Sequence, residues 1–177
     1  AGTAITTGDQ NVAIGYAALD ANTTASNNTG VGYLALGANT TGFSNTAFGS
    51  RSGDAITTGD YNTAVGNLAL SAETTGAQSV AIGHGALASQ NSTSSADMFN
   101  TAVGASSGAA ITTGVQNTFI GGLAGDANTT ANNNTAVGYA SLSTNTTATN
   151  NTAVGSESLT ANTSGAQNTA VGVSSMK

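Results

Sequence analysis

The sequence predicts an all-β fold, a parallel β-solenoid of about ten coils with 17 residues each. A phrase close to Asn-Thr-Ala-Val-Gly recurs along the whole chain, its copies stand 17 residues apart with one exception, and glycine ends every copy. A period held this strictly means that each repeat has the same geometrical role. The ten copies begin at Asn11, Asn28, Asn45, Asn62, Ser79, Asn100, Asn117, Asn134, Asn151 and Asn168.

The first element of each repeat is a short strand. We number the repeat from the first residue of the phrase, and call the residues that share a position a column, starting at column 0. Column 1 holds Thr or Val and column 3 holds Val, Ile or Phe, as in Val80 and Ile82. β-Branched or aromatic residues two apart are typical of a strand with one buried face. We therefore expect columns 1 and 3 to point into the coil.

A bend follows the strand. Column 4 is Gly in all ten copies, which indicates a positive φ angle or a backbone too crowded for a Cβ atom. We expect a second short strand next, with Leu in column 8, and then a turn such as Asn39-Thr40-Thr41-Gly42.

Almost every coil has one large apolar side chain in either column 8 or column 11. Where column 8 is Gly, column 11 is usually Ile, as in Gly53 with Ile56, and where column 8 is Leu, column 11 is mostly polar. One large residue per coil is what a fixed interior volume requires. Gly125 with Asn128 breaks the rule, and we expect Leu123 to fill that gap.

The single irregular spacing marks an insertion. The copies at Ser79 and Asn100 stand 21 residues apart, so residues 89–98 contain four extra residues. The period resumes at Asn100, and we expect the extra residues to leave the coil as a loop. Residues 1–177 then form one repeat domain, which begins and ends within a repeat and which we expect to be part of a longer fibre.

Composition argues against several classes of function. The chain has 2 basic and 8 acidic residues, a net charge of −6 and no Cys, so we expect no nucleic-acid binding and no thiol chemistry. No apolar run is long enough for a membrane helix, and we expect no membrane insertion by this segment. The acids are scattered and His84 stands alone, so we expect no metal site, no cofactor and no enzyme activity. Asp54 and Glu73 are the only pair that we keep open as acids brought together by the fold.

Three polar or aromatic columns have both a structural and a binding interpretation. The Asn of column 0 forms either a stacked ladder of amides or a row that binds a ligand, and the ladder is favoured because it satisfies buried polar groups. The Thr of columns 12 and 13 either bond locally or bind ice or a glycan. Column 5 holds Tyr16, Tyr33 and Tyr139, which either line a solvent-facing edge or stack on sugars.

Nine Asn-x-Ser/Thr sequons occur, a number that a chain rich in Asn and Thr produces by composition. Those of columns 11 and 16 are expected at a turn, where a glycan would be accessible if the host attaches one. The glycosylation candidates that we single out are those of column 11, namely Asn22, Asn39, Asn128, Asn145 and Asn162.

Two phrases carry a resemblance to a known family. Gln78-Ser79-Val80-Ala81-Ile82-Gly83 and Gln10-Asn11-Val12-Ala13-Ile14-Gly15 resemble the head repeats of trimeric autotransporter adhesins. Asn134-Thr135-Ala136-Val137-Gly138-Tyr139 is similar to repeats of phage tail fibres. The resemblance covers the whole chain. It implies a left-handed parallel β-roll, three chains side by side, and a role in attachment.

These observations lead to an expected function. We expect a structural and adhesive extracellular fibre segment, from a cell-surface adhesin or a virion, that associates with copies of itself and attaches to a host-surface glycan or protein. The alternative is an ice- or glycan-binding module that uses the Thr and Tyr columns. Columns 2 and 7 are held small, and by alternation we expect column 2 at an interface between chains, with Phe119 filling a gap there.

Overall fold

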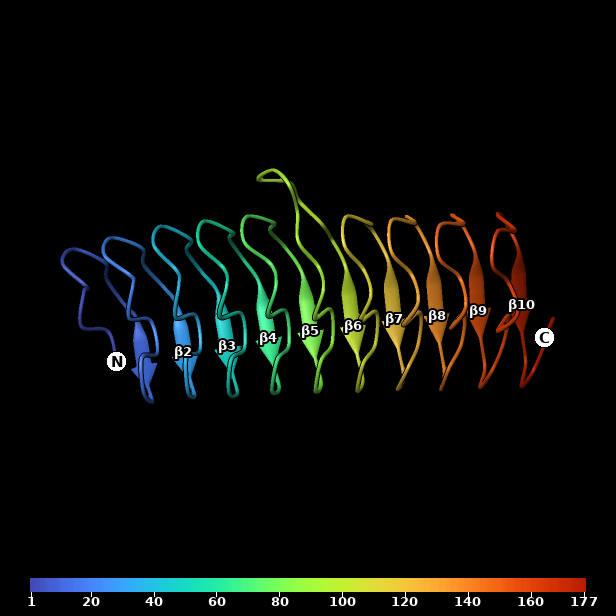
Figure 1. Ribbon diagram of the computed structural model, residues 1–177, viewed down its shortest axis with the longest axis horizontal. Coiled ribbons are helices and arrows are strands. Elements are labelled where there is room, and N and C mark those ends of the chain that lie inside the picture. The colour runs from blue at the N-terminus through green and yellow to red at the C-terminus, as the bar shows by residue number, and fades with distance from the viewer.

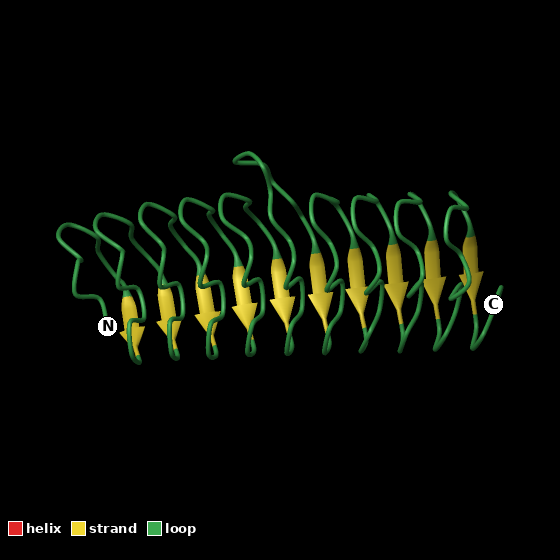
Figure 2. Ribbon diagram, in the orientation of Figure 1, coloured by secondary structure: helices red, strands yellow, loops and turns green.

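The structure is a computed structural model that describes residues 1–177 and contains strands and turns but no helix. One strand of each coil contributes to a single parallel sheet of 10 strands, which follow one another in sequence order along a straight rod (Figure 1). Figure 2 shows that all other segments are loops and turns. The strands are β1 (Val12–Ile14), β2 (Thr29–Val31), β3 (Thr46–Phe48), β4 (Thr63–Val65), β5 (Val80–Ile82), β6 (Thr101–Val103), β7 (Thr118–Ile120), β8 (Thr135–Val137), β9 (Thr152–Val154) and β10 (Thr169–Val171).

Successive coils stack in register, as the 17-residue period predicts. Ala47 of β3 lies opposite Ala64 of β4, and every other strand pair keeps the same register. Column 4 shows why its Gly is invariant. Gly66 has φ 132°, and a Cβ atom there would lie 2.6 Å from the carbonyl oxygen of Gly83 in the next coil. Both reasons expected for this glycine, a positive φ and backbone crowding, are therefore confirmed.

The face of the strand that points inward is opposite to the one expected. Column 2 is buried and columns 1 and 3 point outward, half-buried or exposed. The reason is the thinness of the coil. At Gly30 of column 2, a Cβ atom would already lie 3.0 Å from the carbonyl oxygen of Ala35 and 3.2 Å from Cγ of Leu19. A β-branched pair does not fit in this space, so alanine fills it.

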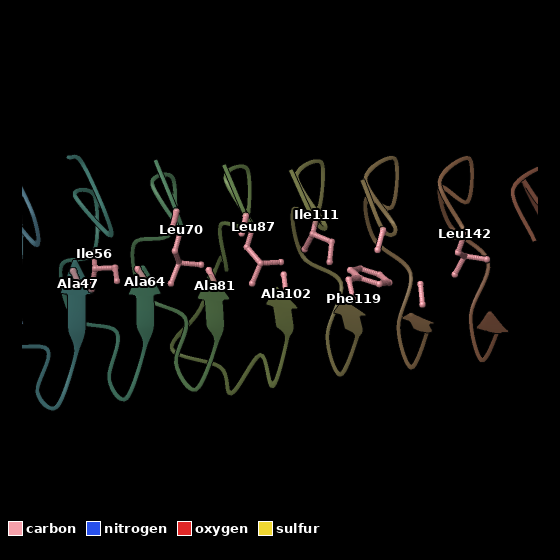
Figure 3. Close-up of a cluster of buried hydrophobic side chains, with 14 of the residues drawn as sticks. Ala47, Ile56, Ala64, Leu70, Ala81, Leu87, Ala102, Ile111, Phe119 and Leu142 are labelled. Atoms are coloured by element: carbon pink, nitrogen blue, oxygen red, sulfur yellow. The ribbon is translucent and has the colours of Figure 1, made fainter. Parts of the chain in front are cut away.

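The core is a row of small strand residues facing large residues from the opposite wall. Figure 3 shows Ala64, Ala81 and Ala102 pointing from their strands toward Leu70, Leu87 and Ile111. Column 7, the other column held small, is also buried in nearly every coil. Column 8 points inward as expected, with Leu36, Leu70 and Leu87 fully buried.

The second strand expected around column 8 does not exist. Columns 6, 8 and 16 adopt the left-handed conformation in every coil, with φ from 50° to 64°. Leu70, for example, has φ 53°. This conformation costs a residue with a Cβ atom roughly 1–2 kcal/mol. Burial of the leucine side chain, worth about 1.5–3 kcal/mol, offsets that cost.

The exchange between columns 8 and 11 is confirmed, and its one exception has a different explanation from the one expected. Ile56 and Ile111 are fully buried where column 8 is Gly. Leu123 is only half-buried and does not fill the space beside Gly125. Phe119 of column 2 fills it: a Cβ atom on Gly125 would lie 2.5 Å from the phenyl ring. Phe119 is therefore a core residue and not a plug between chains.

Phe119 and Gly125 should behave as one unit. Phe119→Ala should destabilise the solenoid by about 3–5 kcal/mol because it empties the core beside two glycines. Gly125→Leu alone should also destabilise, because its side chain overlaps the ring. The double variant restores the Ala and Leu of the common repeat and should recover most of the loss. Chemical denaturation of the three variants measures this, and additive losses would contradict it.

The insertion leaves the coil as expected. The segment rises above the line of the other coils between β5 and β6 (Figure 1). The two strands still pair in register, with Val80 opposite Thr101. The base of the insertion is nevertheless part of the core, because Met98 is 1% exposed.

A buried polar network joins the insertion to the coils. Glu73 occupies column 11 and is fully buried. Its carboxylate accepts hydrogen bonds from the backbone N–H groups of Thr74, Thr75, Gly76 and Ser92, at 2.7 to 3.3 Å, and from Nε2 of Gln90 at 3.0 Å. A carboxylate surrounded by five donors is satisfied without a cation.

The same network repairs the one gap in the Asn column. Ser79 stands where other coils have Asn, and its short side chain cannot reach the next coil. Gln90 spans the gap, because its Nε2 donates to Oγ of Ser79 at 2.8 Å and its Oε1 accepts from Nδ2 of Asn100 at 2.9 Å. Glu73 at the end of one repeat and Ser79, Gln90 and the insertion in the next are therefore physically coupled.

Candidate interaction surface

The outer face of the sheet is the largest regular surface of the molecule. It consists of columns 1 and 3 of all ten strands, and we call it the strand face. Column 3 is Val, Ile or Phe throughout. Five of its side chains are exposed, from 38% at Ile82 to 69% at Val171, and the other five are half-buried. No charged residue occurs in either column. The face is therefore a continuous apolar stripe that follows the rod.

Column 1 adds hydroxyl groups to this stripe. Eight of its ten residues are Thr, and none of their side-chain hydroxyls makes a hydrogen bond within the chain. The Thr of column 12 differ, because several donate to the backbone carbonyl of the Thr one coil further on, as Thr57 does to Thr74 at 3.0 Å. The local bonding expected for Thr is thus confirmed at column 12. The unpartnered hydroxyls lie on the strand face and on the exposed corner of column 13.

The Asn column is a structural ladder, as favoured from the sequence. Oδ1 of Asn45 accepts from the backbone N–H of Asn62 at 2.9 Å, and Nδ2 of Asn45 donates to the carbonyl of Gly59 at 2.8 Å. The same pair of bonds recurs along the rod, and most of these side chains are buried. Amides engaged in this way are not available to a ligand.

The glycosylation candidates of column 11 lie inside the coil, which corrects the expectation of an accessible turn. Asn22, Asn39, Asn128 and Asn145 are fully buried, and Asn162 is half-buried. Most of them bond the backbone three residues on, as Asn22 does to Ala25. A glycan on these side chains does not fit the folded coil. The exposed Asn sequons are those of column 16, such as Asn133, and Asn91 in the insertion.

Column 5 forms an exposed edge along one border of the strand face. Tyr16 and Tyr33 stack on neighbouring coils, with ring centroids 5.5 Å apart and planes inclined by 13°. Tyr139 lies on the same edge further along and is exposed. His84 is also exposed on this edge.

The charged groups form no cluster. Glu73 is fully buried, whereas Asp54 is half-buried in another coil and accepts a hydrogen bond from Nε of Arg51 at 2.9 Å, so the two acids have different partners and form no pair. Burial raises the pKa of Asp126, and Lys177 lowers the pKa of Glu157. No three acidic or imidazole groups meet in a way that could hold a metal ion. The surface contains no pocket, and the molecule contains no helix that could cross a lipid bilayer.

Comparisons of this chain with family models, with curated proteins and with solved structures found no match.

The sequence predicts columns 1 and 3 inside the coil, and this prediction is wrong because they form the outer strand face. Alternation identifies two faces and does not say which one is inside. One signal was present: column 2 is Ala or Gly in nine of ten copies, which is the pattern of a position too narrow for any larger residue.

Proposed function

We propose that this chain is a rigid segment of an extracellular adhesive fibre, in which copies associate side by side through the strand face. The observation that carries the proposal is the exposed apolar column 3, which extends unbroken over ten strands. The trimer, the left-handed coil and the location on a cell surface or virion come from the resemblance to adhesin heads and tail fibres, and belong to the same proposal.

The size of the strand face supports an interface. With coils about 4.8 Å apart and two columns about 7 Å apart, the face covers on the order of 400 Å² in projection. Exposed apolar patches of this size often have a function in monomeric proteins. The face is also flat, uncharged and self-similar, so a second copy in parallel orientation meets it without an unpaired charge.

The rod itself suits a fibre. Each coil is joined to the next by strand hydrogen bonds and by the Asn ladder, so the stack resists bending along its length. Neighbouring coils are the only contacts that each coil makes, as in other repeat architectures. The rod therefore lengthens by adding repeats, and its outer columns present the same residues at each step.

Substitutions that place charges on the strand face should dissociate the oligomer without unfolding the chain. In the double variant Val103→Asp, Val137→Asp, like charges meet across every copy of the interface, and the oligomer should become a folded monomer. The matched control is Thr130→Asp, Thr147→Asp, at exposed positions of column 13, which lie outside the strand face. Mass photometry gives the oligomeric state and circular dichroism the fold. Wild-type chain that is monomeric at micromolar concentration would contradict the proposal.

A second function is favoured by the unpartnered hydroxyls of column 1. Eight Thr hydroxyls at one-coil spacing beside a row of methyl groups form a flat, regular array that could order water, as an ice-binding surface does. This alternative requires the strand face to be free. Inhibition of ice recrystallisation by monomeric chain, lost in the Val103→Asp, Val137→Asp variant, would favour it over self-association.

A further inference from the structure

One position of the column 5 edge combines an exposed aromatic ring with a small neighbour. Tyr33, which is 50% exposed, stacks on Tyr16 of the preceding coil. Column 5 of the following coil is Ser50, an exposed small residue. The coil after it carries Asn67, whose Nδ2 donates to the carbonyl of Ser50 at 3.1 Å. Ser50 therefore stands between a phenol ring and an amide along this edge.

The only arginine of the chain belongs to the same coil as Ser50. Arg51 follows Ser50, and its backbone N–H donates to the carbonyl of Tyr33 at 2.7 Å, so the two residues lie in contact through the backbone. Its Nε donates to Oδ2 of Asp54 at 2.9 Å, which orients the guanidinium, while its two terminal nitrogens make no hydrogen bond within the chain. The hydrogen bond and charge of Asp54 raise the pKa of Arg51, so the guanidinium stays charged.

The chain contains a natural comparison for this arrangement. Tyr139 is followed one coil later by Ser156, and the backbone N–H of Glu157 donates to the carbonyl of Tyr139 at 2.8 Å. The tyrosine and the serine are the same residue types in both places. Column 6 there is Glu157 in place of arginine, and its carboxylate pairs with Lys177.

We propose that the exposed surface formed by Tyr33, Ser50 and Arg51 binds one acidic sugar residue, such as a uronic acid of a surface polysaccharide. The C–H groups of the pyranose ring, which carry partial positive charge, pack on the electron-rich face of Tyr33. The sugar carboxylate accepts two hydrogen bonds from the free terminal nitrogens of Arg51, the planar fork that matches a carboxylate. Asp54 holds the other edge of the guanidinium and does not meet the ligand. This inference names the ligand class of the attachment surface, and its biological setting rests on the proposed function.

The test is titration of the full chain with tetragalacturonate, followed by calorimetry and by the NMR signal of the arginine Nε–H, which is unique because Arg51 is the only arginine. The methyl ester of the same tetrasaccharide is the uncharged control ligand. We expect the acid to bind with one site per chain and to shift the Nε–H signal. Arg51→Gln should weaken binding at least about tenfold, the loss expected when a charged hydrogen-bonding partner is removed. Tyr33→Ser should weaken binding about three- to tenfold, because it removes the aromatic contact with the sugar ring.

The comparison position around Tyr139 makes the test specific. Tyr139→Ser should leave binding unchanged, whereas Glu157→Arg should create a second site and double the stoichiometry. Equal binding of acid and ester, or binding that survives Arg51→Gln, would overturn the site. Binding is measured on chain of known oligomeric state and again on Val103→Asp, Val137→Asp. Absence of binding therefore overturns the sugar site alone, and a monomeric wild type overturns the fibre interface alone.

Discussion

Replacing Ala81 by Asp should unfold the solenoid. Ala81 is fully buried in β5, opposite Ala64 and Ala102 in the neighbouring coils. The interior at this column has room for a methyl group and no polar partner for a carboxylate. An unpaired charge there should cost on the order of 5 kcal/mol, and the added volume increases the loss. Chemical denaturation followed by circular dichroism should show no folded baseline or a greatly reduced midpoint.

Val80→Asp is the matched control, one residue earlier in the same strand. Val80 belongs to column 1 and points outward, half-buried. Its carboxylate reaches water, so the free energy of unfolding of the single chain should change by no more than about 1 kcal/mol. From the sequence alone, the opposite order of the two effects would be expected, with Val80 inside. If Val80→Asp destabilised the monomer more than Ala81→Asp, the inward direction of column 2 would be wrong.

Glu73→Ala should destabilise the chain by about 5 kcal/mol. The substitution leaves the N–H groups of Thr74, Thr75, Gly76 and Ser92 without their acceptor, together with the amide of Gln90. Each buried donor that loses its partner costs about 1–3 kcal/mol, reduced where water enters. The loss should be accompanied by proteolytic sensitivity in the insertion, because Ser92 is the link that holds its base. Limited proteolysis and chemical denaturation measure the two effects.

Glu73→Asn separates the roles of this carboxylate. Asn is the common residue of column 11, and Asn22 accepts a backbone N–H three residues on through its Oδ1. Asn at position 73 should restore the bond to Gly76 but cannot reach both Ser92 and Gln90. We expect about half of the loss seen for Glu73→Ala. A Glu73→Ala chain as stable as the wild type would show that the network has no part in the fold.

Much of the architecture could be predicted because it is repeated. The 17-residue period predicted the stacking register, the invariant Gly66 and its equivalents predicted the bend, and the exchange between Gly53 and Ile56 predicted one large core residue per coil. The Asn ladder followed from the need to satisfy polar groups in a stacked turn. These features depend only on neighbouring coils that have the same residues. A strict sequence repeat shows that this condition is met.

Other features depend on distances that no pattern records. Phe119 fills the space beside Gly125 although the two belong to different walls of the coil, and Gln90 spans from Glu73 to Asn100 across three coils. The sequence predicts a second strand around Leu70 and its equivalents, whereas these residues adopt left-handed φ angles. Backbone corners of this kind accept several residue types when burial offsets their strain, so their signal in the sequence is weak.

The sequence by itself determined the coil length, the parallel register, the glycine bend, the amide ladder and the size of the core. Only the tertiary structure decided which side of the strand is inside, and with it the location of the candidate interaction surface. The physical reason is that a two-residue alternation is symmetric about the sheet plane. The choice between its faces is made by the width of the coil, where a Cβ atom at Gly30 already meets Ala35 and Leu19. Alanine therefore fills the interior, and the valine, isoleucine and threonine residues form the outer face.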